Sequence, residues 1–277
     1  MTDANHDPVA ELVGLGLDRR EARWLVEEFL PGGDPDSLTV LRGAAQRRLD
    51  GEPLQYIIGH WPFRSLDLDV DPRVLIPRPE TEGLVDVALG ELAAAASLAP
   101  LLVDLGCGSG AIGLSLLDEL RVRGVAATLV ALDESTDALD VARANARKHH
   151  LHAVSFVASS WFDALDSSLR GRVDLVVANP PYVGASEMQT LDPVLRYEPL
   201  GALVAPDEGG VVGFGDLDLI VRESLGWLRP GGSIVMEHGE RQRTPLIELA
   251  KKYGYVDVHD LDDLSGRTRT FVARRPA

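Results

Sequence analysis

Residues 101–110 read Leu-Leu-Val-Asp-Leu-Gly-Cys-Gly-Ser-Gly, an apolar run that opens directly into a glycine-rich turn. A continuous apolar run of this length is typical of a strand that is buried on both faces of a sheet. The glycines allow the backbone to turn sharply and to approach a ligand closely. Together they predict a doubly wound α/β sheet, with a ligand crevice at the carboxyl ends of its strands.

Strand and helix patterns alternate around this stretch, from residue 80 to the end of the chain. Apolar runs predict strands at 101–105, 128–133, 154–157, 173–178 and 233–237, followed by two closing strands. Helical periodicity predicts helices at 80–96, 111–121, 135–149, 215–228 and 243–253. A long loop is expected from about 182 to 213, and the proline and glycines of residues 229–232 are expected to stop the helix that precedes them. This order predicts a mostly parallel sheet with helices on both faces.

The N-terminal part of the chain has a different pattern. Residues 8–50 show helical periodicity with a break at 31–35, which predicts a small helical unit. Residues 56–61 and 66–70 are predicted to be extended, and the second piece alternates with period two, so a hairpin is expected. We therefore predict a helical domain at 1–52, a β-hairpin connector at 53–78 and the main α/β domain at 79–277.

Composition narrows the class of protein. The net charge of −16 argues against extensive binding to the phosphate backbone of nucleic acids, which requires clustered Lys and Arg. The single cysteine, Cys107, excludes a disulfide framework and fits a reducing cytoplasm. No signal peptide and no membrane-spanning run are expected. These features predict a cytoplasmic protein that binds neither membranes nor nucleic acid stably.

The glycine loop and a following acid suggest a nucleoside site. Asp133 ends the second strand of the domain, where an acid can accept the hydroxyls of a ribose. The alternative is that Asp133 caps the next helix, although Ser135 is the better cap candidate. Residues 108–113 also satisfy the dinucleotide pattern G-x-G-x-x-G, so a nicotinamide enzyme and a purely structural turn remain alternatives.

The most specific motif is Asn179-Pro180-Pro181-Tyr182, which directly follows the predicted strand at 173–178. The prolines restrict the turn, so the Asn179 side-chain oxygen and the Pro180 carbonyl can act as fixed acceptors. Two acceptors would hold both hydrogens of an incoming NH2 group, while Tyr182 packs on its planar π system. A proline-rich structural turn is the alternative. Paired with the glycine loop, the motif predicts methyl transfer to a planar nitrogen.

Three other features are open to more than one interpretation. Trp161-Phe162 follows the third strand, where Trp161 could pack on an adenine ring or fill the core. His149, His150 and His152 lie at a predicted helix end, which favours cations, so no metal site is expected. Glu237-His238 ends a strand on the ligand edge and suits a structural or a catalytic role.

With these residues in view, the chain resembles the HemK/PrmC family of peptide chain release factor N(5)-glutamine methyltransferases over nearly its whole length. The resemblance rests on residues 51–59, 75–82, 104–110, 179–182 and 197–199. It implies a class I S-adenosylmethionine-dependent methyltransferase with a seven-stranded sheet, which releases S-adenosylhomocysteine and needs no metal. The acceptor it implies is the glutamine of a release factor's Gly-Gly-Gln motif, so methylation would modulate translation termination.

The resemblance also implies roles for individual residues. The cofactor would be bound by Gly106, Cys107, Gly108, Ser109, Gly110, Asp133, Trp161 and Asn179. The catalytic residues would be Asn179, Pro180 and Tyr182, and the substrate would be held by these together with Pro181, Arg78 and Glu80. Two departures concern cofactor and substrate contacts: Ser160 stands where many relatives have an acid, and residues 205–215 are less typical.

Rival functions lack their expected features. An adenine-N6 methyltransferase of DNA or RNA would use the same turn on a flipped base, but it would need a basic channel or a target-recognition domain. A non-catalytic protein with the methyltransferase fold would have lost key residues of the glycine loop or the asparagine turn, whereas both are intact here. A dehydrogenase would not explain Asn179. The helical domain is expected to dock on the release factor, because Trp24, Leu25 and Phe29 offer more apolar surface than so small a unit hides.

Overall fold

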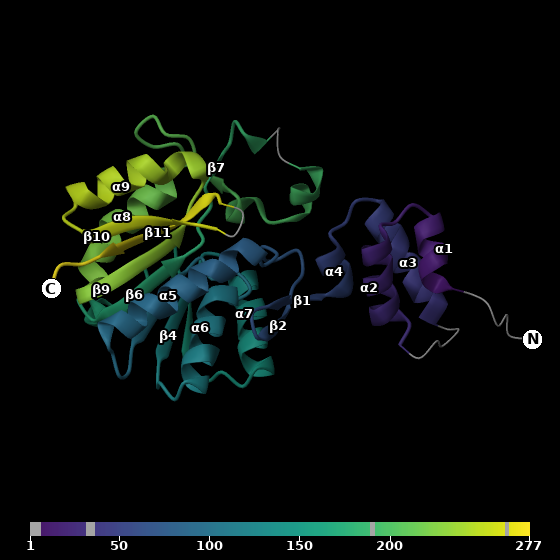
Figure 1. Ribbon diagram of the computed structural model, residues 1–277, viewed down its shortest axis with the longest axis horizontal. Coiled ribbons are helices and arrows are strands. Elements are labelled where there is room, and N and C mark those ends of the chain that lie inside the picture. The colour runs from purple at the N-terminus through teal and green to yellow at the C-terminus, as the bar shows by residue number, and fades with distance from the viewer. Residues whose placement is uncertain (1–6, 32–36, 189–191, 264–265) are drawn as a thin grey trace, which may run out of the picture.

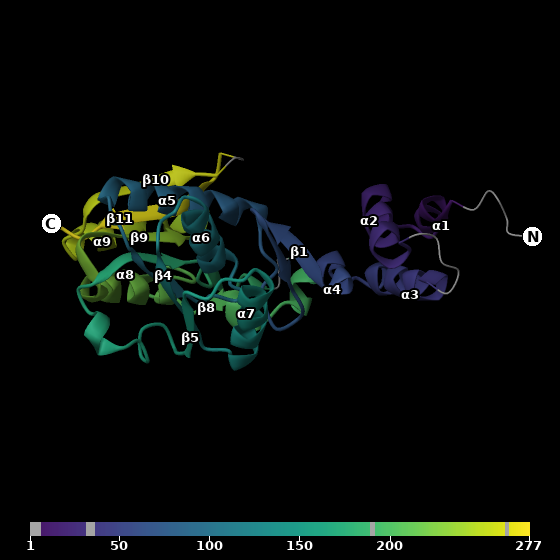
Figure 2. The same ribbon diagram turned by 90° about the horizontal axis from the view of Figure 1, so that it is seen from below.

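The computed structural model describes residues 7–31, 37–188, 192–263 and 266–277. Figures 1 and 2 show a helical N-terminal unit at one end of the molecule and a larger α/β unit at the other. A short helix and a hairpin lie between the two units. Along the chain, the helical unit comes first, the short helix and hairpin follow, and the α/β unit comes last.

The helical unit contains α1 (Pro8–Gly14), α2 (Arg19–Phe29) and α3 (Ser37–Leu49). Asp7 and Asp18 begin the first two helices, because each side chain accepts hydrogen bonds from backbone N–H groups of the first turn. The core of this unit is aliphatic and includes Leu12, Leu25 and Leu41, which are at most 2% exposed. Burial of one apolar stripe per helix holds the three helices together.

The connector differs from the prediction at its start. Residues 54–58 form a helix, α4 (Leu54–Ile58), and only then come β1 (His60–Phe63) and β2 (Leu66–Asp69), which pair as an antiparallel hairpin. The extended conformation predicted at 56–58 was wrong, while the hairpin is confirmed. Gly59 ends α4 in the left-handed region with φ 88°, which is readily accessible to glycine.

Helix α4 is buried on two sides, which explains why its residues are apolar without a clear period. Leu54 and Ile57 belong to the core of the helical unit. Tyr56 packs instead with Val70, and its hydroxyl donates to the Val74 carbonyl at 2.6 Å. The predicted boundary at residue 52 thus precedes a helix that contributes to both units.

The main sheet has seven strands in the order β10-β11-β9-β6-β3-β4-β5. Its central strands are parallel, and β11 pairs antiparallel with both β9 and β10. The strands are β3 (Leu101–Leu105), β4 (Thr128–Asp133), β5 (Val154–Ala158), β6 (Val173–Ala178), β9 (Leu228–Glu237), β10 (Val256–Asp262) and β11 (Thr268–Arg274). The predicted doubly wound, mostly parallel sheet is confirmed.

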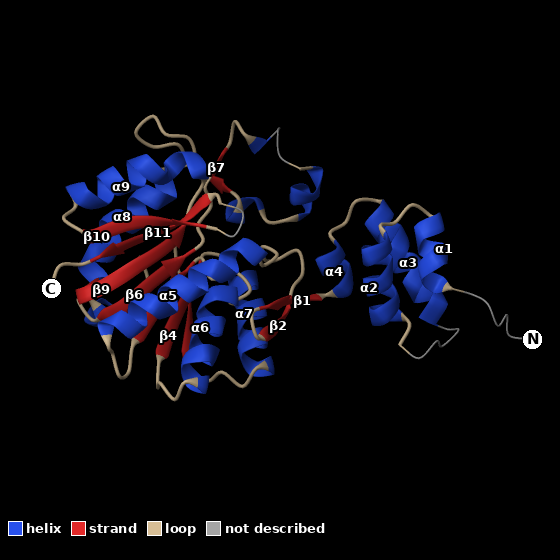
Figure 3. Cartoon of the chain, viewed as in Figure 1, coloured by secondary structure: helices blue, strands red, loops and turns tan. Residues whose placement is uncertain are grey.

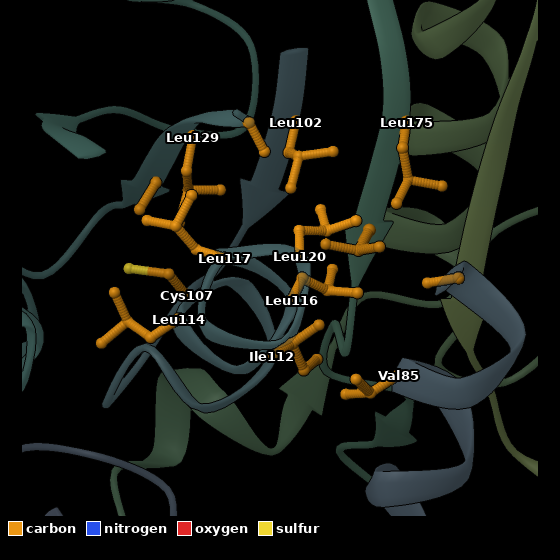
Figure 4. Close-up of a cluster of buried hydrophobic side chains, with 14 of the residues drawn as sticks. Val85, Leu102, Cys107, Ile112, Leu114, Leu116, Leu117, Leu120, Leu129 and Leu175 are labelled. Atoms are coloured by element: carbon orange, nitrogen blue, oxygen red, sulfur yellow. The ribbon is translucent and has the colours of Figure 1, made fainter. Parts of the chain in front are cut away.

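Helices cover both faces of this sheet (Figure 3). They are α5 (Glu82–Ala95), α6 (Ala111–Val122), α7 (Thr136–Lys148), α8 (Gly215–Trp227) and α9 (Arg243–Lys252). The first three pack on one face through a leucine-rich core, and α8 and α9 pack on the other. Figure 4 shows part of the first core, with Cys107 near Leu114 and Leu117. This three-layer arrangement fixes the strand ends that form the site.

The predicted proline-glycine stop at 229–232 is confirmed, because α8 ends at Trp227. The following strand, predicted at 233–237, is longer than expected: β9 begins at Leu228 and includes residues 229–232. The strand continues because the backbone of Gly231 and Gly232 pairs with Arg275, which extends the contact with the C-terminal segment. The predicted loop at 182–213 contains β7 (Val183–Gly184) and β8 (Val204–Ala205), which form a small parallel pair. Among the helices of the described ranges, none has the length and apolarity needed to cross a membrane.

Asp104 on β3 links this strand to the following helix. It is 1% exposed, and its Oδ2 accepts the Gly113 backbone N–H at 2.9 Å. A Cβ atom at residue 113 would lie 2.7 Å from that oxygen, so only glycine fits beside it. Burial raises the pKa of Asp104 to about 7, because desolvation outweighs the one backbone hydrogen bond.

This buried acid predicts a pH dependence of stability. In the unfolded chain this carboxyl loses its proton near its ordinary pKa, whereas in the folded protein it keeps the proton up to about pH 7. The stability that the neutral carboxyl contributes is therefore lost as the pH rises towards about 7. In the unliganded protein, Asp104→Asn should reduce the fall in unfolding free energy between about pH 5 and about pH 8 by roughly 2–3 kcal/mol. Urea unfolding of the wild type and the variant at both pH values measures this fall. The same fall in both proteins would contradict the prediction.

Candidate functional site

A cavity of about 570 Å³ opens at the carboxyl ends of β3, β4 and β6. This is the edge at which the sequence predicted a ligand crevice, and the volume suits a molecule of nucleoside size. Most of the cavity's polar groups come from loops that directly follow strands. Its walls include six residues that were predicted from the sequence: Gly106, Gly108, Asp133, Trp161, Asn179 and Pro181.

The glycine loop has the left-handed backbone conformation that its composition predicts. Gly106, Gly108 and Gly110 have φ values of 66°, 55° and 84°, a region that other residues rarely adopt. A side chain on Gly106 would meet the Trp161 ring at 3.5 Å, whereas the space beside Gly108 is open. The loop therefore brings bare backbone to the cavity wall.

The other residues of the loop support it from behind. Cys107 is 6% exposed and belongs to the core beneath the sheet, so its thiol does not face the cavity. The Ser109 carbonyl accepts a hydrogen bond from Asn145 at 2.9 Å, and Gly110 packs against Leu114. Neither these three residues nor Pro180 and Tyr182 line the cavity in the described part of the chain.

Asp133 connects the second strand to the glycine loop. Its Oδ2 accepts the Gly108 N–H at 2.8 Å, and its Oδ1 accepts the Ser135 N–H at 2.9 Å. Ser135 is the N-cap of α7, with its hydroxyl accepting from the Ala138 N–H at 3.1 Å, so Asp133 is not the cap. Burial raises the pKa of Asp133 against these hydrogen bonds, which lower it. The carboxylate thus orders the loop and lines the cavity at the same time.

Trp161 forms another wall of the cavity. Its backbone has φ 45°, an unusual value for a bulky residue, and its indole N–H donates to Asp216 at 3.1 Å. Asp216 was not predicted, although it lies at the start of α8 and lines the same cavity. Ser160, the departure noted in the sequence, also lines the wall. The ring therefore lines the cavity and at the same time packs against the core on the α8 and α9 face of the sheet.

The asparagine turn closes the cavity on the side of β6. Asn179 and Pro181 line it, whereas Pro180 is buried and Tyr182 is half-buried behind them. The Tyr182 carbonyl accepts from Gln242 at 3.0 Å, and its hydroxyl lies 3.2 Å from a Glu237 carboxylate oxygen. Burial is the main cause that raises the pKa of Tyr182 to about 12, so the phenol stays protonated at neutral pH.

Comparison with known proteins identifies the family. Residues 101–258 match a family model described as a methyltransferase domain. A release factor glutamine methyltransferase of Aliivibrio fischeri is 38% identical over 83% of this chain and 76% of its own length. One of Bordetella pertussis is 37% identical over 93% of this chain and 95% of its own. The chain belongs to the release factor glutamine methyltransferase family.

Solved structures that resemble this family member share its fold. A methyltransferase from Pyrococcus furiosus is 15% identical and has a TM-score of 0.52, with 77% of this chain and 91% of that one covered. The hMettl16 catalytic domain is also 15% identical, with a TM-score of 0.57 over 99% of this chain and 94% of its own. At these identities, the comparison supports the class I methyltransferase fold alone.

In this family member, two further predicted substrate residues, Arg78 and Glu80, also lie away from the cavity wall. Arg78 donates to Glu198, whose other oxygen accepts the Ile76 backbone N–H at 3.1 Å. Glu198 is 4% exposed, and the next residue, Pro199, lines the cavity. Glu80 is exposed beside them in the chain. Arg78 therefore fastens the loop of residues 193–202 to the connector, a role that the sequence did not predict.

The histidines do not form a metal site in the part of the chain that the structure describes. His149 is bonded to the Asp67 carbonyl at 2.8 Å, which ties the end of α7 to the hairpin. His238 is fully buried between the Gly239 carbonyl and Asp260, with both contacts at 2.8 Å. Of the two roles considered for Glu237-His238, the histidine contacts are structural, whereas Glu237 contacts the asparagine turn through Tyr182.

The Glu198 anchor generates a prediction about stability. Glu198→Ala removes the partner of Arg78 and leaves the buried Ile76 N–H without its acceptor, so the unfolding free energy should fall by roughly 1–3 kcal/mol. Denaturant unfolding measures the change, and limited proteolysis should show faster cleavage within 193–202. Asp140→Ala, which removes an exposed ion pair with Arg143, is the matched control and should lower the unfolding free energy by under about 1 kcal/mol. Equal effects would contradict the anchoring role.

Proposed function

We propose that this protein transfers a methyl group from S-adenosylmethionine to the side-chain amide nitrogen of the glutamine in a release factor's Gly-Gly-Gln motif. The product cofactor is S-adenosylhomocysteine, and methylation modulates translation termination in the cytoplasm. The observation that carries the proposal is the asparagine turn on the wall of a nucleoside-sized cavity, in a member of this family. The acceptor nitrogen and the methyl donor must meet at such a wall.

The cavity residues fit the cofactor. Bare backbone at Gly106 and Gly108 admits a close ligand, Asp133 offers carboxylate oxygens for ribose hydroxyls, and the Trp161 ring offers a flat face for adenine. Cys107, Ser109 and Gly110 contribute by holding the loop in shape. The cofactor supplies an electrophilic methyl group on a sulfonium. The remaining catalytic requirements fall on residues of this chain, and none of them calls for a metal.

The turn suits an amide substrate because an amide nitrogen is a poor nucleophile. Its lone pair is delocalised into the carbonyl, so the enzyme must orient it and favour a more pyramidal nitrogen. In our proposal the Asn179 side-chain oxygen and the Pro180 carbonyl accept the two amide hydrogens, and Pro181 and Tyr182 bound the planar group. No strong base is required, since the product nitrogen becomes acidic and loses its proton late.

Arg78 and Glu80, which also lie outside the cavity wall, receive modified roles in this proposal. Glu80 is exposed at the start of the short 3-10 helix Pro79–Thr81, where the protein substrate can reach it. Arg78 acts on the substrate through the loop that Glu198 anchors. Both proposals concern recognition of the release factor rather than the methyl transfer itself.

Incubation with S-adenosylmethionine and purified release factors, followed by peptide mass spectrometry, tests the function. A methyl group on the Gly-Gly-Gln glutamine supports it. A release factor with glutamate in that position is the control, because a carboxylate cannot accept the methyl group on nitrogen. Methylation of DNA or RNA instead would favour the adenine-N6 alternative, which the acidic chain makes less favourable.

Asn179→Ala should lower methyl transfer by about 100-fold or more, because it removes a preorganised polar contact to the reacting group. Calorimetry should show that the variant still binds S-adenosylmethionine, since the glycine loop and Asp133 are intact. Near-normal turnover in the folded variant would contradict the assigned role of Asn179.

The structure corrects the argument for a docking domain. Leu25 is fully buried, and Trp24 and Phe29 are half-buried against the core of the helical unit. Trp24 also packs edge-on against Trp61, with ring centroids 5.4 Å apart, so these residues leave less apolar surface free than expected. We still propose that residues 1–52 dock on the release factor, because this unit stands at the end of the molecule nearest the loop of residues 193–202 (Figure 1). The Tyr197 hydroxyl bridges the two parts by donating to the Asp50 carbonyl at 3.2 Å.

Hydrogen exchange on the intact protein tests the docking proposal. Amides of α1, α2 and α3 should gain protection when an intact release factor is added, because a second contact excludes water from the helical unit. A short peptide containing Gly-Gly-Gln should leave these amides unchanged while it competes for the cavity. Equal exchange in the presence of the intact factor and of the peptide would remove the proposal.

A further inference from the structure

A buried carboxylate lies behind the asparagine turn. Glu237 ends β9, is 3% exposed and does not line the cavity. Its Oε2 accepts the Thr81 hydroxyl at 2.7 Å, and its Oε1 lies 3.2 Å from the Tyr182 hydroxyl. An ionised carboxylate costs free energy to bury unless it is well paired. Its position therefore calls for an explanation other than packing.

The contacts of Thr81 fix the orientation of the asparagine amide. A hydroxyl has a single proton, and Thr81 donates it to Glu237, so its oxygen is left to accept. The group that it accepts from is the Asn179 Nδ2, at 3.4 Å. With its NH2 turned towards Thr81, the Asn179 amide must present its oxygen in the opposite direction. The direction of this chain of hydrogen bonds depends on Glu237 being an acceptor.

The same carboxylate holds the other end of the turn. The Tyr182 hydroxyl donates to Glu237 and accepts from Arg269 at 3.0 Å. Burial raises the pKa of Glu237, and the hydrogen bond from Thr81 and the nearby Arg269 guanidinium partly offset this rise. Gln242 fixes the Tyr182 backbone by donating to its carbonyl at 3.0 Å. Asn179 and Tyr182 are thus tied to one buried group from two sides.

We propose that Thr81 and Glu237 are positioning residues that set the amide of Asn179 with its oxygen towards the substrate nitrogen. This inference rests on the proposed function, in which that oxygen accepts a hydrogen of the substrate amide. Neither residue touches the reacting atoms. The reversed amide would present an NH2 group to the substrate NH2, and two donors cannot bond to each other.

The test compares Thr81→Val with Thr81→Ser in the full-length protein. Valine keeps the shape of threonine without its hydroxyl, and serine keeps the hydroxyl. Thr81→Val should lower kcat roughly 10- to 100-fold, the scale expected for a mispositioned reactive group, with the KM for S-adenosylmethionine changed less than about 2-fold. Thr81→Ser should restore most of kcat. Wild-type kcat in Thr81→Val, or no rescue by serine, would overturn the proposal.

Two further variants keep the test decisive. Glu237→Gln keeps the shape of the side chain but can donate to Thr81, and so can reverse the direction of the hydrogen bonds. It should therefore lower kcat. Adding Thr81→Val to this variant should lower kcat little further, because both changes act through one network. Additive losses would overturn the proposal. Ser224→Ala, which removes a buried hydroxyl bonded to the Ile220 carbonyl on α8, is the matched control and should leave kcat unchanged.

A readout without substrate separates this inference from the proposed function. The side-chain NH2 resonances of Asn179, assigned by their loss in Asn179→Ala, should shift in Thr81→Val and Glu237→Gln but not in Ser224→Ala. Unshifted resonances would overturn the positioning role, even in an active enzyme. If the wild-type protein methylates no release factor, the proposed function fails, whereas shifted resonances would still support the hydrogen-bond chain.

Discussion

The site depends on the register of three parallel strands. β3 pairs with β4 on one side and β6 on the other, so Leu105, Leu132 and Ala178 lie at neighbouring positions along one edge. The glycine loop, Asp133 and Asn179 each begin within a residue of those positions. A shift of one residue in either pairing would turn every side chain of the strand to the opposite face and separate these groups. Backbone pairing thus sets the geometry of the cavity before any side chain is considered.

Much of this arrangement could be predicted from the sequence, because strong local signals coincide with it. Apolar runs bounded by Gly106 or Asn179 identify buried strands, and parallel strands must share an edge. Helix α4 could not be predicted in the same way. Its five residues are buried on two sides, so they lack the period that distinguishes a helix from a strand. The proline-glycine stop at 229–232 correctly marked the end of α8, but its inclusion in β9 could not be predicted, because it depends on pairing with Arg275 in a distant segment of the chain.

Residues that act through others were the hardest to predict. Glu198 and Asp216 contact their partners, Arg78 and Trp161, across more than fifty positions of the chain. No local pattern records such a contact. The motif around Glu198 was visible as Tyr-Glu-Pro, but only the fold shows that its carboxylate reaches the connector.

Helix α4 has a consequence for building hybrids between relatives. Leu54 and Ile57 complete the core of the helical unit, while Tyr56 reaches Val74, which lines the cavity. A junction placed at residue 52 would join one parent's helices to another parent's α4 and leave mismatched apolar surfaces within one small core. A junction placed after Leu75 would instead transplant the helical unit together with Arg73, Val74 and Leu75 of the cavity wall. Exchange of the helical unit with its α4 contacts intact therefore carries part of the cavity wall with it.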